Sequence, residues 1–217
     1  MMASGRPLAR GSRAPHDGRD WLAAAVRPHY PKLALALGAD LFEALMGVYI
    51  ARGPNESRAS RERGGELVEF LAGGSDYPAW YGELAKLDRA YAEVWQAPPV
   101  ARLSRNELST DRPLQLVPAS TLLQLTTTVD EAWSALGRGE PPTQPRTLDW
   151  PRTVLVWRDE RPTVYAYAAG LTEGAALRTV KRGTSLTELS GYFTGDDAFS
   201  RALDMVLRWA DAGVLAR

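Results

Sequence analysis

The sequence predicts a mostly α-helical protein of two domains, a helical N-terminal domain and a small C-terminal α+β domain. Three observations carry this prediction. Apolar residues recur at three- and four-residue steps over much of the first 136 residues. The stretch 153–170 instead places β-branched and aromatic residues at a period of two, which predicts a β-hairpin. Between them, 137–146 reads GRGEPPTQPR, with the proline and glycine content of a linker.

Composition narrows the class of protein. The 217 residues include 26 basic and 26 acidic side chains, so net charge provides no overall attraction to nucleic acid or to an anionic membrane. The absence of cysteine excludes disulfides, thiolate metal sites and a cysteine nucleophile, and it fits a reducing compartment. The longest apolar runs, such as 21–26, are too short to span a bilayer. We therefore expect a cytoplasmic protein without a membrane partner.

Helix-capping and helix-breaking residues predict where the N-terminal helices begin and end. Residues 1–20 are rich in Gly, Ser, Pro and Arg, which predicts a flexible tail. Asp20 is placed to cap a short helix over 21–27. Pro31 suits the first turn of the next helix, Gly38 ends it, and Asp40 begins another.

The longest predicted helix, 76–96, carries a continuous apolar stripe along one face. The stripe consists of Trp80, Leu84, Leu87, Tyr91 and either Val94 or Trp95. Aromatic residues at helical spacing are typical of a core, so we assign the stripe to packing. Residues 121–128 allow a strand or an extended wall, and a helix over 129–136 completes the helical domain, 21–136.

The predicted linker, 137–148, leads to the α+β domain, 149–217. The hairpin, 153–168, is followed by a helix over 171–181 and by a short helix that begins at the capping box Ser185–Glu188. In the final helix, Phe199, Leu203, Val206 and Leu207 are expected to share the buried face.

Residues that carry chemistry are sparse. The two histidines, His16 and His29, lie near the N-terminus, without a His-x-x-x-His pair or a carboxylate cluster beside them. The glycine-rich phosphate-binding motifs are missing from the sequence. We therefore expect no catalytic residues, no metal site and no cofactor.

A hairpin followed by three helices suits two functions: a winged helix that binds DNA, and a related small fold that captures a peptide on an open sheet edge. Residues 150–217 hold nine basic and eight acidic residues, and the final helix has four aspartates against two arginines. A helix with more acidic than basic residues is repelled by the phosphates that line a DNA groove, so nucleic acid is not the expected partner.

Peptide capture needs an exposed strand edge and side chains that line a groove beside it. The residues that we expect to contact the peptide are Trp157, Val164, Tyr165, Tyr167, Arg201 and Arg208. Ordinary cross-strand or core packing remains an alternative role for each of the aromatic residues.

Several motifs, in this order and spacing, resemble one family. They are YPKLALALGADLFEALMGVYIARGP, ELVEFLAG, YGELAKLDRAYAEVWQAP, VPASTLLQL, DEAW, TVLVWRDE and DAGVLA. The chain from about residue 21 onward resembles the HvfC-like proteins, long labelled DNA-binding proteins. One departure is Leu87-Asp88, where the family often has Leu-Glu.

The resemblance implies a function that the residue patterns alone do not supply. HvfC-like proteins are encoded beside multinuclear non-haem iron enzymes that oxidise ribosomally made peptides. The resemblance therefore implies a heteromeric complex, in which the helical domain docks the iron-dependent enzyme and the α+β domain binds the leader of the precursor peptide. The older label keeps a winged-helix DNA-binding regulator as the alternative.

Overall fold

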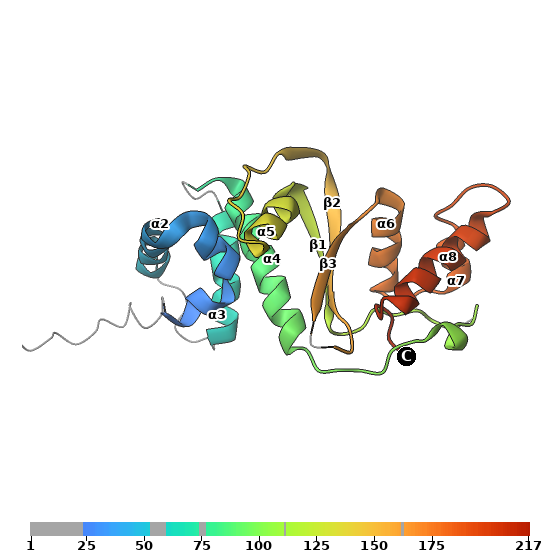
Figure 1. The fold of residues 1–217 in the computed structure, drawn as a ribbon. Coiled ribbons are helices and arrows are strands. Elements are labelled where there is room, and N and C mark those ends of the chain that lie inside the picture. Colours follow the sequence, from blue (N-terminus) through green and yellow to red (C-terminus); the bar gives the residue numbers. More distant parts are fainter. Residues whose placement is uncertain (1–23, 53–59, 74–76, 111, 162) are drawn as a thin grey trace, which may run out of the picture.

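The protein is built around a three-stranded antiparallel sheet with the strand order β1-β2-β3 (Figure 1). The computed structural model describes residues 24–52, 60–73, 77–110, 112–161 and 163–217, so the tail predicted for 1–20 lies outside the described residues. The elements are η1 (Arg27–His29), α2 (Pro31–Ala51), α3 (Ser60–Ala72), α4 (Ala79–Gln96), η2 (Arg105–Glu107), β1 (Ser120–Thr127), α5 (Val129–Gly137), β2 (Thr147–Arg158), β3 (Val164–Ala169), α6 (Leu171–Val180), α7 (Leu186–Ser190) and α8 (Ala198–Asp211).

The predicted hairpin is confirmed as β2 and β3, which pair from Arg158↔Val164 to Thr153↔Ala169. β1 pairs along the other edge of β2, so the sheet has a third strand beyond the predicted hairpin. β1 overlaps 121–128, the stretch that the sequence left open between strand and extended wall. Its Leu and Thr content suits a strand whose two faces are both covered.

Each face of the sheet packs on its own hydrophobic core. Side chains alternate along β2, so Val154 and Val156 join the core of α2, α4 and α5 while Leu155 joins the core of α6, α7 and α8. Figure 1 shows the sheet between these two groups of helices. The mostly α architecture with an α+β part is therefore confirmed, and the sheet lies between the two parts.

The predicted domain boundary falls inside this arrangement. The segment 137–148 joins α5 to β2, which pairs with β1 from the preceding part, and β2 itself begins at Thr147. Leu103 and Leu114, which the sequence placed in the helical domain, are buried in the core of α6–α8. Their segment pairs with the C-terminus through the bridges Arg102↔Ala216 and Leu116↔Leu215.

Two buried carboxylates on α4 hold the N-terminal helices and the sheet together. Asp88 accepts hydrogen bonds from the backbone N–H groups of Lys32 and Leu33, both at 2.9 Å, and from Trp133 Nε1 at 3.1 Å. It thereby caps the first turn of α2, which has no capping side chain of its own. Glu83 accepts four hydrogen bonds from the backbone and hydroxyl groups of Thr126 and Thr127 at the end of β1.

Helix α2 corrects one expectation about apolar runs. By length and composition, this helix is long and apolar enough to cross a membrane, a test that core helices of globular proteins also pass. Gly38, at φ 73° and ψ 170°, breaks it into two shorter helices, as the sequence predicts. Its buried side chains pack in the core and are Leu33, Leu37, Phe42, Leu45, Met46 and Tyr49.

The C-terminal helices match the predicted positions, with one error of orientation. The capping box at the start of α7 is confirmed, because Ser185 Oγ accepts from the Glu188 N–H and the Glu188 carboxylate accepts from the Ser185 N–H. The predicted buried face of α8 is wrong in part, since Phe199 is exposed. The buried side chains of α8 are Ala202, Met205, Val206, Trp209 and Ala210.

Candidate peptide-binding site

β3 forms one edge of the sheet, and among the described residues only β2 pairs with it. The backbone N–H of Arg158 bonds to Ala119 on the β1 side, and N–H directions alternate along a strand. Trp157 and Leu155 therefore direct their backbone polar groups toward β3, opposite Tyr165 and Tyr167.

This alternation leaves the backbone polar groups of Val164, Ala166 and Ala168 on the outer edge of β3. An incoming strand would bond to these three residues. The side chain of Val164 packs against the core of α2, α4 and α5, on the face of the strand opposite to Tyr165. Neighbouring side chains on a strand point to opposite faces, and Val164 contributes only its backbone.

Three aromatic side chains cover the face of the hairpin that α8 approaches. The ring of Trp157 stacks on Tyr165, with centroids 5.3 Å apart, and meets Tyr167 edge-on at 5.8 Å. Tyr165 is 37% exposed, and its hydroxyl donates to Asp159 Oδ2 at 3.3 Å. The sequence-predicted trio is therefore one cluster, with Tyr165 as its accessible member.

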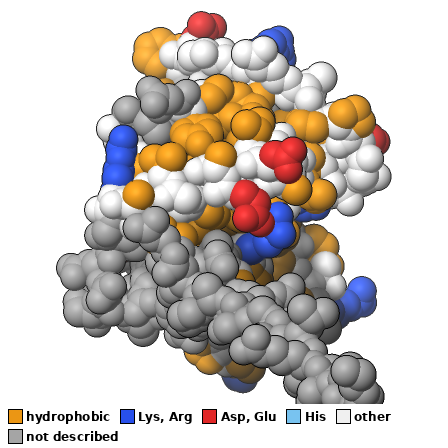
Figure 2. Space-filling model, turned by 90° about the vertical axis from the view of Figure 1, so that its left-hand side faces the viewer, with side chains coloured by type: hydrophobic (Ala, Val, Ile, Leu, Met, Phe, Trp, Pro, Cys, Tyr) orange, Lys and Arg blue, Asp and Glu red, His pale blue; other side chains and the backbone are white. Residues whose placement is uncertain are grey.

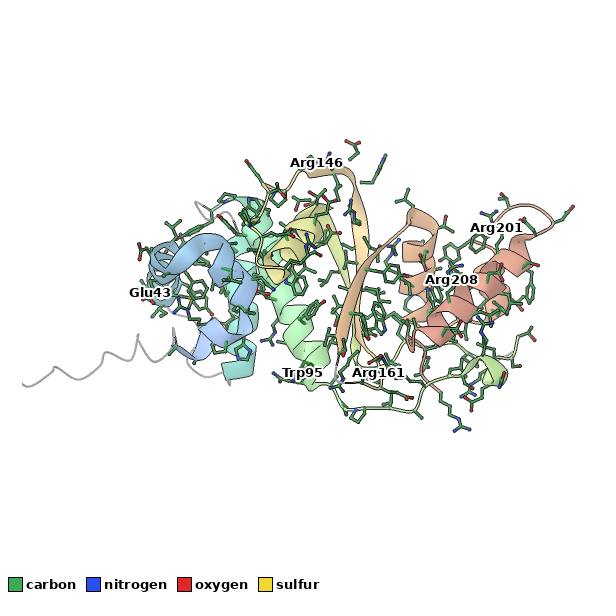
Figure 3. All side chains as sticks on the ribbon, in the orientation of Figure 1. Glu43, Trp95, Arg146, Arg161, Arg201 and Arg208 are labelled. Atoms are coloured by element: carbon green, nitrogen blue, oxygen red, sulfur yellow. The ribbon has the colours of Figure 1, made fainter. Side chains whose placement is uncertain are left out.

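The C-terminal end of α8 lies against the β2–β3 hairpin, and the helix also bonds to α6. Near the start of β3, Trp157 Nε1 donates to the carbonyl oxygen of Ala212, just after α8, at 2.9 Å. Beyond its end, Glu173 in α6 accepts from Trp209 Nε1 at 2.9 Å. Figure 3 shows Arg208 and Arg201 farther along α8, away from Arg161 at the hairpin turn.

A cavity of about 450 Å³ lies between the start of α6 and α8, and we call it the α6–α8 cavity. It is lined by Gly170, Leu171, Thr172, Glu173, Phe193, Arg201, Asp204, Met205 and Arg208. The guanidinium of Arg201 lies over the ring of Phe193, with its carbon 4.8 Å from the ring centroid. Within the described part of the chain, neither Arg201 nor Arg208 forms an ion pair, so both remain able to bind a carboxylate.

A second hollow, of about 620 Å³, lies at the other end of the line between β3 and α8. Trp157 and Tyr165 form one side of it, and the C-terminal end of α8 at 210–213 forms another. The hairpin turn contributes Asp159, Glu160 and Arg161. One hollow borders Tyr165 near the start of β3 and the other borders Gly170 just after its end, so a peptide strand would find space for side chains at both ends.

Tyr167 lies between the two hollows and carries a buried polar atom. Its hydroxyl has no well-aligned hydrogen bond to the described residues, but it lies beside the Glu173 carboxylate. Burial raises the pKa of this phenol, and the interaction with Glu173 raises it further. The hydroxyl therefore stays protonated across the physiological range and can donate to Glu173 or to a bound peptide.

The site includes residues that the sequence reasoning did not assign. Glu173, Phe193 and Trp209 belong to it, and Trp209 could have been found from the spacing 202, 205, 206 and 209 on one face of the final helix. Among the residues that the structure describes, no group of three His, Asp or Glu side chains is placed to hold a metal ion.

Searches against models of known protein families and against curated proteins returned no match to this chain. The resemblance to the HvfC-like proteins therefore stays a prediction.

Proposed function

We propose that this protein is a non-catalytic recognition subunit, which binds the leader of a ribosomally made precursor peptide and presents it to a multinuclear non-haem iron-dependent oxidative enzyme. The observation that carries the first half is the outer edge of β3, where the backbone groups of Val164, Ala166 and Ala168 have no partner strand among the described residues. Strand addition derives affinity from such an edge and specificity from the pockets beside it.

The side-chain chemistry along this edge suits an extended peptide with acidic residues. Tyr165 and Trp157 offer apolar surface at one end, and Arg201 and Arg208 offer two guanidinium groups at the other. Arginine binds carboxylates in a bidentate manner, which fixes the register of the bound strand.

The iron-dependent enzyme enters the proposal through the family resemblance, with the helical part as its docking surface. Leu35, Leu41 and Val48 on α2 are exposed. Figure 2, which views the side where α2 lies, shows hydrophobic side chains gathered there. Exposed apolar groups of this kind favour contact with another protein. Co-purification with the enzyme should decrease when Leu41 is replaced by Asp, and should not change for Trp95→Ala.

A proline scan of β3 tests strand addition. Ala166→Pro removes an N–H from the outer edge, where proline is tolerated, whereas Tyr165→Pro removes one that faces β2 and should destabilise the fold. We expect Ala166→Pro to stay folded and to lose affinity by roughly tenfold, about 1.4 kcal/mol. The probe is the synthetic leader of the precursor encoded beside this gene, measured by fluorescence anisotropy.

Ala166→Val, which keeps the N–H, is the matched control and should bind nearly as the wild type does. A folded Ala166→Pro variant with wild-type affinity would refute strand addition at this edge. Neighbouring genes that include neither an iron oxidase nor a short precursor would count against the assigned partners.

The alternative function is a DNA-binding regulator that inserts α8 into a groove. The exposed charged residues of α8 are Arg201, Asp204, Arg208 and Asp211, and Asp211 is paired with Arg105. Carboxylates interleaved with arginines repel phosphates, so we expect only weak, salt-sensitive DNA binding. Tight binding to the protein's own promoter in a gel shift with competitor DNA would favour the regulator.

A further inference from the structure

A large cavity lies beyond the C-terminal end of β3. β3 stops at Ala169, opposite Thr153, whereas β2 already begins at Thr147. The cavity occupies about 710 Å³ where β3 would continue if it were longer, and we call it the strand-end cavity. It is lined by Gln124, Leu148, Asp149, Trp150, Pro151, Arg152, Thr153, Ala169, Gly170, Leu171 and Arg178.

Two large apolar side chains stand exposed at this cavity. Trp150 is 74% exposed and Leu171 is 76% exposed. A single exposed apolar residue is ordinary, but two on the lining of one cavity are typical of a surface that receives a ligand. Neither side chain belongs to the buried residues of the two cores.

Arg178 brings an unneutralised positive charge to the same cavity. Its Nη1 donates to Thr153 Oγ1 at 2.7 Å, and Gln124 Nε2 donates to the same oxygen at 2.8 Å. Within the described ranges, Arg178 forms no ion pair, whereas Arg152 is already paired with Asp130 at 2.8 Å. Arg178 is thus held in place by a neutral hydroxyl and keeps donors for an external carboxylate.

The strand-end cavity adjoins the proposed peptide site. Gly170 and Leu171 line both it and the α6–α8 cavity. A Cβ atom added at Gly170 would meet no atom within 4 Å, so the surface above this residue is open. A chain bound along the edge of β3 can therefore pass over Gly170 into the strand-end cavity.

We propose that the strand-end cavity is a second subsite for the same peptide, which binds an acidic side chain on Arg178 and an adjacent apolar side chain between Trp150 and Leu171. This inference rests on the proposed function, because the peptide reaches the cavity from the β3 edge. The carboxylate replaces water around the free guanidinium donors, and the apolar neighbour covers exposed indole and leucine surface. The subsite thereby selects peptides with an acidic–apolar pair beyond the paired strand.

A charge reversal tests this subsite. A displayed library of random peptides is selected on the immobilised full-length chain, on Arg178→Glu and on Arg182→Glu as the matched control at the end of the same helix. We expect the wild type and the control to enrich Asp or Glu beside an aromatic or aliphatic residue. The Arg178→Glu chain should lose that acid and enrich Lys or Arg at the same position.

Affinities of one selected peptide complete the test. Arg178→Gln should weaken its binding by about tenfold, and Trp150→Ala should also weaken it, while Trp95→Ala, which removes an exposed indole elsewhere, should not. If the acid persists on Arg178→Glu while Ala166→Pro still weakens binding by roughly tenfold, the subsite is refuted and strand addition stands. If no peptide is selected on the wild type, both proposals are overturned.

Discussion

The two faces of the central sheet differ in what joins them to their helices. On the side of α2, α4 and α5, two nearly inaccessible carboxylates, Glu83 and Asp88, accept seven hydrogen bonds from segments far away in sequence. On the side of α6–α8, the fully buried polar side chains that the structure describes are threonines, Thr153 and Thr184.

The side of α2, α4 and α5 is therefore held in one arrangement by hydrogen bonds, whereas the side of α6–α8 carries the candidate peptide site. Buried carboxylates with many donors are costly to disrupt, so they hold the helices in one arrangement. The other side relies on apolar packing, on two indole hydrogen bonds, from Trp157 and Trp209, and on the hydrogen bond from Arg178 to Thr153. The hollows beside β3 lie on that side, where peptide side chains would replace water.

The largest effect is expected where α4 meets β1. Glu83→Ala leaves the backbone and hydroxyl donors of Thr126 and Thr127 without their acceptor, and each unsatisfied buried group costs about 1–3 kcal/mol. The free energy of unfolding should fall by about 4 kcal/mol, measured by urea denaturation. Glu93→Ala, in an exposed pair with Arg89, should cost less than about 1 kcal/mol. Equal losses in the two variants would remove the contrast between a structural and a surface carboxylate.

The next largest effect is the pH dependence of stability, which we expect to arise from Asp88 on the side of α2, α4 and α5. Burial raises the pKa of Asp88 to about 6 from 3.8, against the opposing effect of its hydrogen bonds. Between about pH 4 and pH 6 the folded chain therefore holds a proton that the unfolded chain has released. The contribution of Asp88 to stability is greatest below about pH 4 and is lost as the pH rises to 6, by up to about 3 kcal/mol.

Urea denaturation across this pH range measures the effect. Asp88→Asn, which cannot titrate, should show a flatter dependence between pH 4 and pH 6 than the wild type. A wild-type profile that is unaffected by Asp88→Asn in this window would show that folding does not raise the pKa of Asp88.

The sequence predicted the apolar positions of α4 but not the partners of its buried carboxylates. The apolar stripe of α4 was predictable because core residues recur at helical spacing, and Leu84, Leu87 and Val94 are buried. Asp88 was noted only as a departure from Leu-Glu, since its partners come from α2 and α5, and nothing local indicates which distant backbone groups a carboxylate will cap.

The site was predicted in part for a similar reason. β-Branched and aromatic residues at a period of two predicted the β2–β3 hairpin and its aromatic trio. β1 pairs with β2 although α5 lies between them in the sequence, and no turn motif indicates such a long-range contact. The error at Phe199 came from the phase assigned to the apolar stripe of α8. The buried face includes Ala202 and Trp209, whereas Phe199 is exposed.

The packing of α6 against β2 gives the next effect. A Cβ atom at Gly174 would lie 2.6 Å from Thr153 Oγ1 and 2.7 Å from Thr153 Cβ, which is closer than atoms can pack. Gly174→Ala should therefore lower stability by about 2 kcal/mol. Gly170→Ala, which meets no atom within 4 Å, should change stability by less than about 1 kcal/mol, as a thermal melt would show. A neutral Gly174→Ala would mean that α6 moves freely on the sheet.

The smallest effect separates the two sides through a pair of tyrosines. Tyr30 on the α2 side and Tyr167 on the α8 side each bury a hydroxyl without a well-aligned hydrogen bond to the described residues, and burial raises the pKa of both phenols. Removing an unpaired buried hydroxyl stabilises a fold, so Tyr30→Phe and Tyr167→Phe should each raise the free energy of unfolding by up to about 1 kcal/mol in urea denaturation.

Peptide binding should respond to only one of these two substitutions. Tyr167 lies on β3 between Tyr165 and the start of α6, where a bound strand offers an acceptor in addition to Glu173, so Tyr167→Phe should weaken binding by roughly threefold to tenfold. Tyr30→Phe should leave the affinity unchanged. Equal affinities for both variants would mean that the peptide does not reach the Tyr167 hydroxyl.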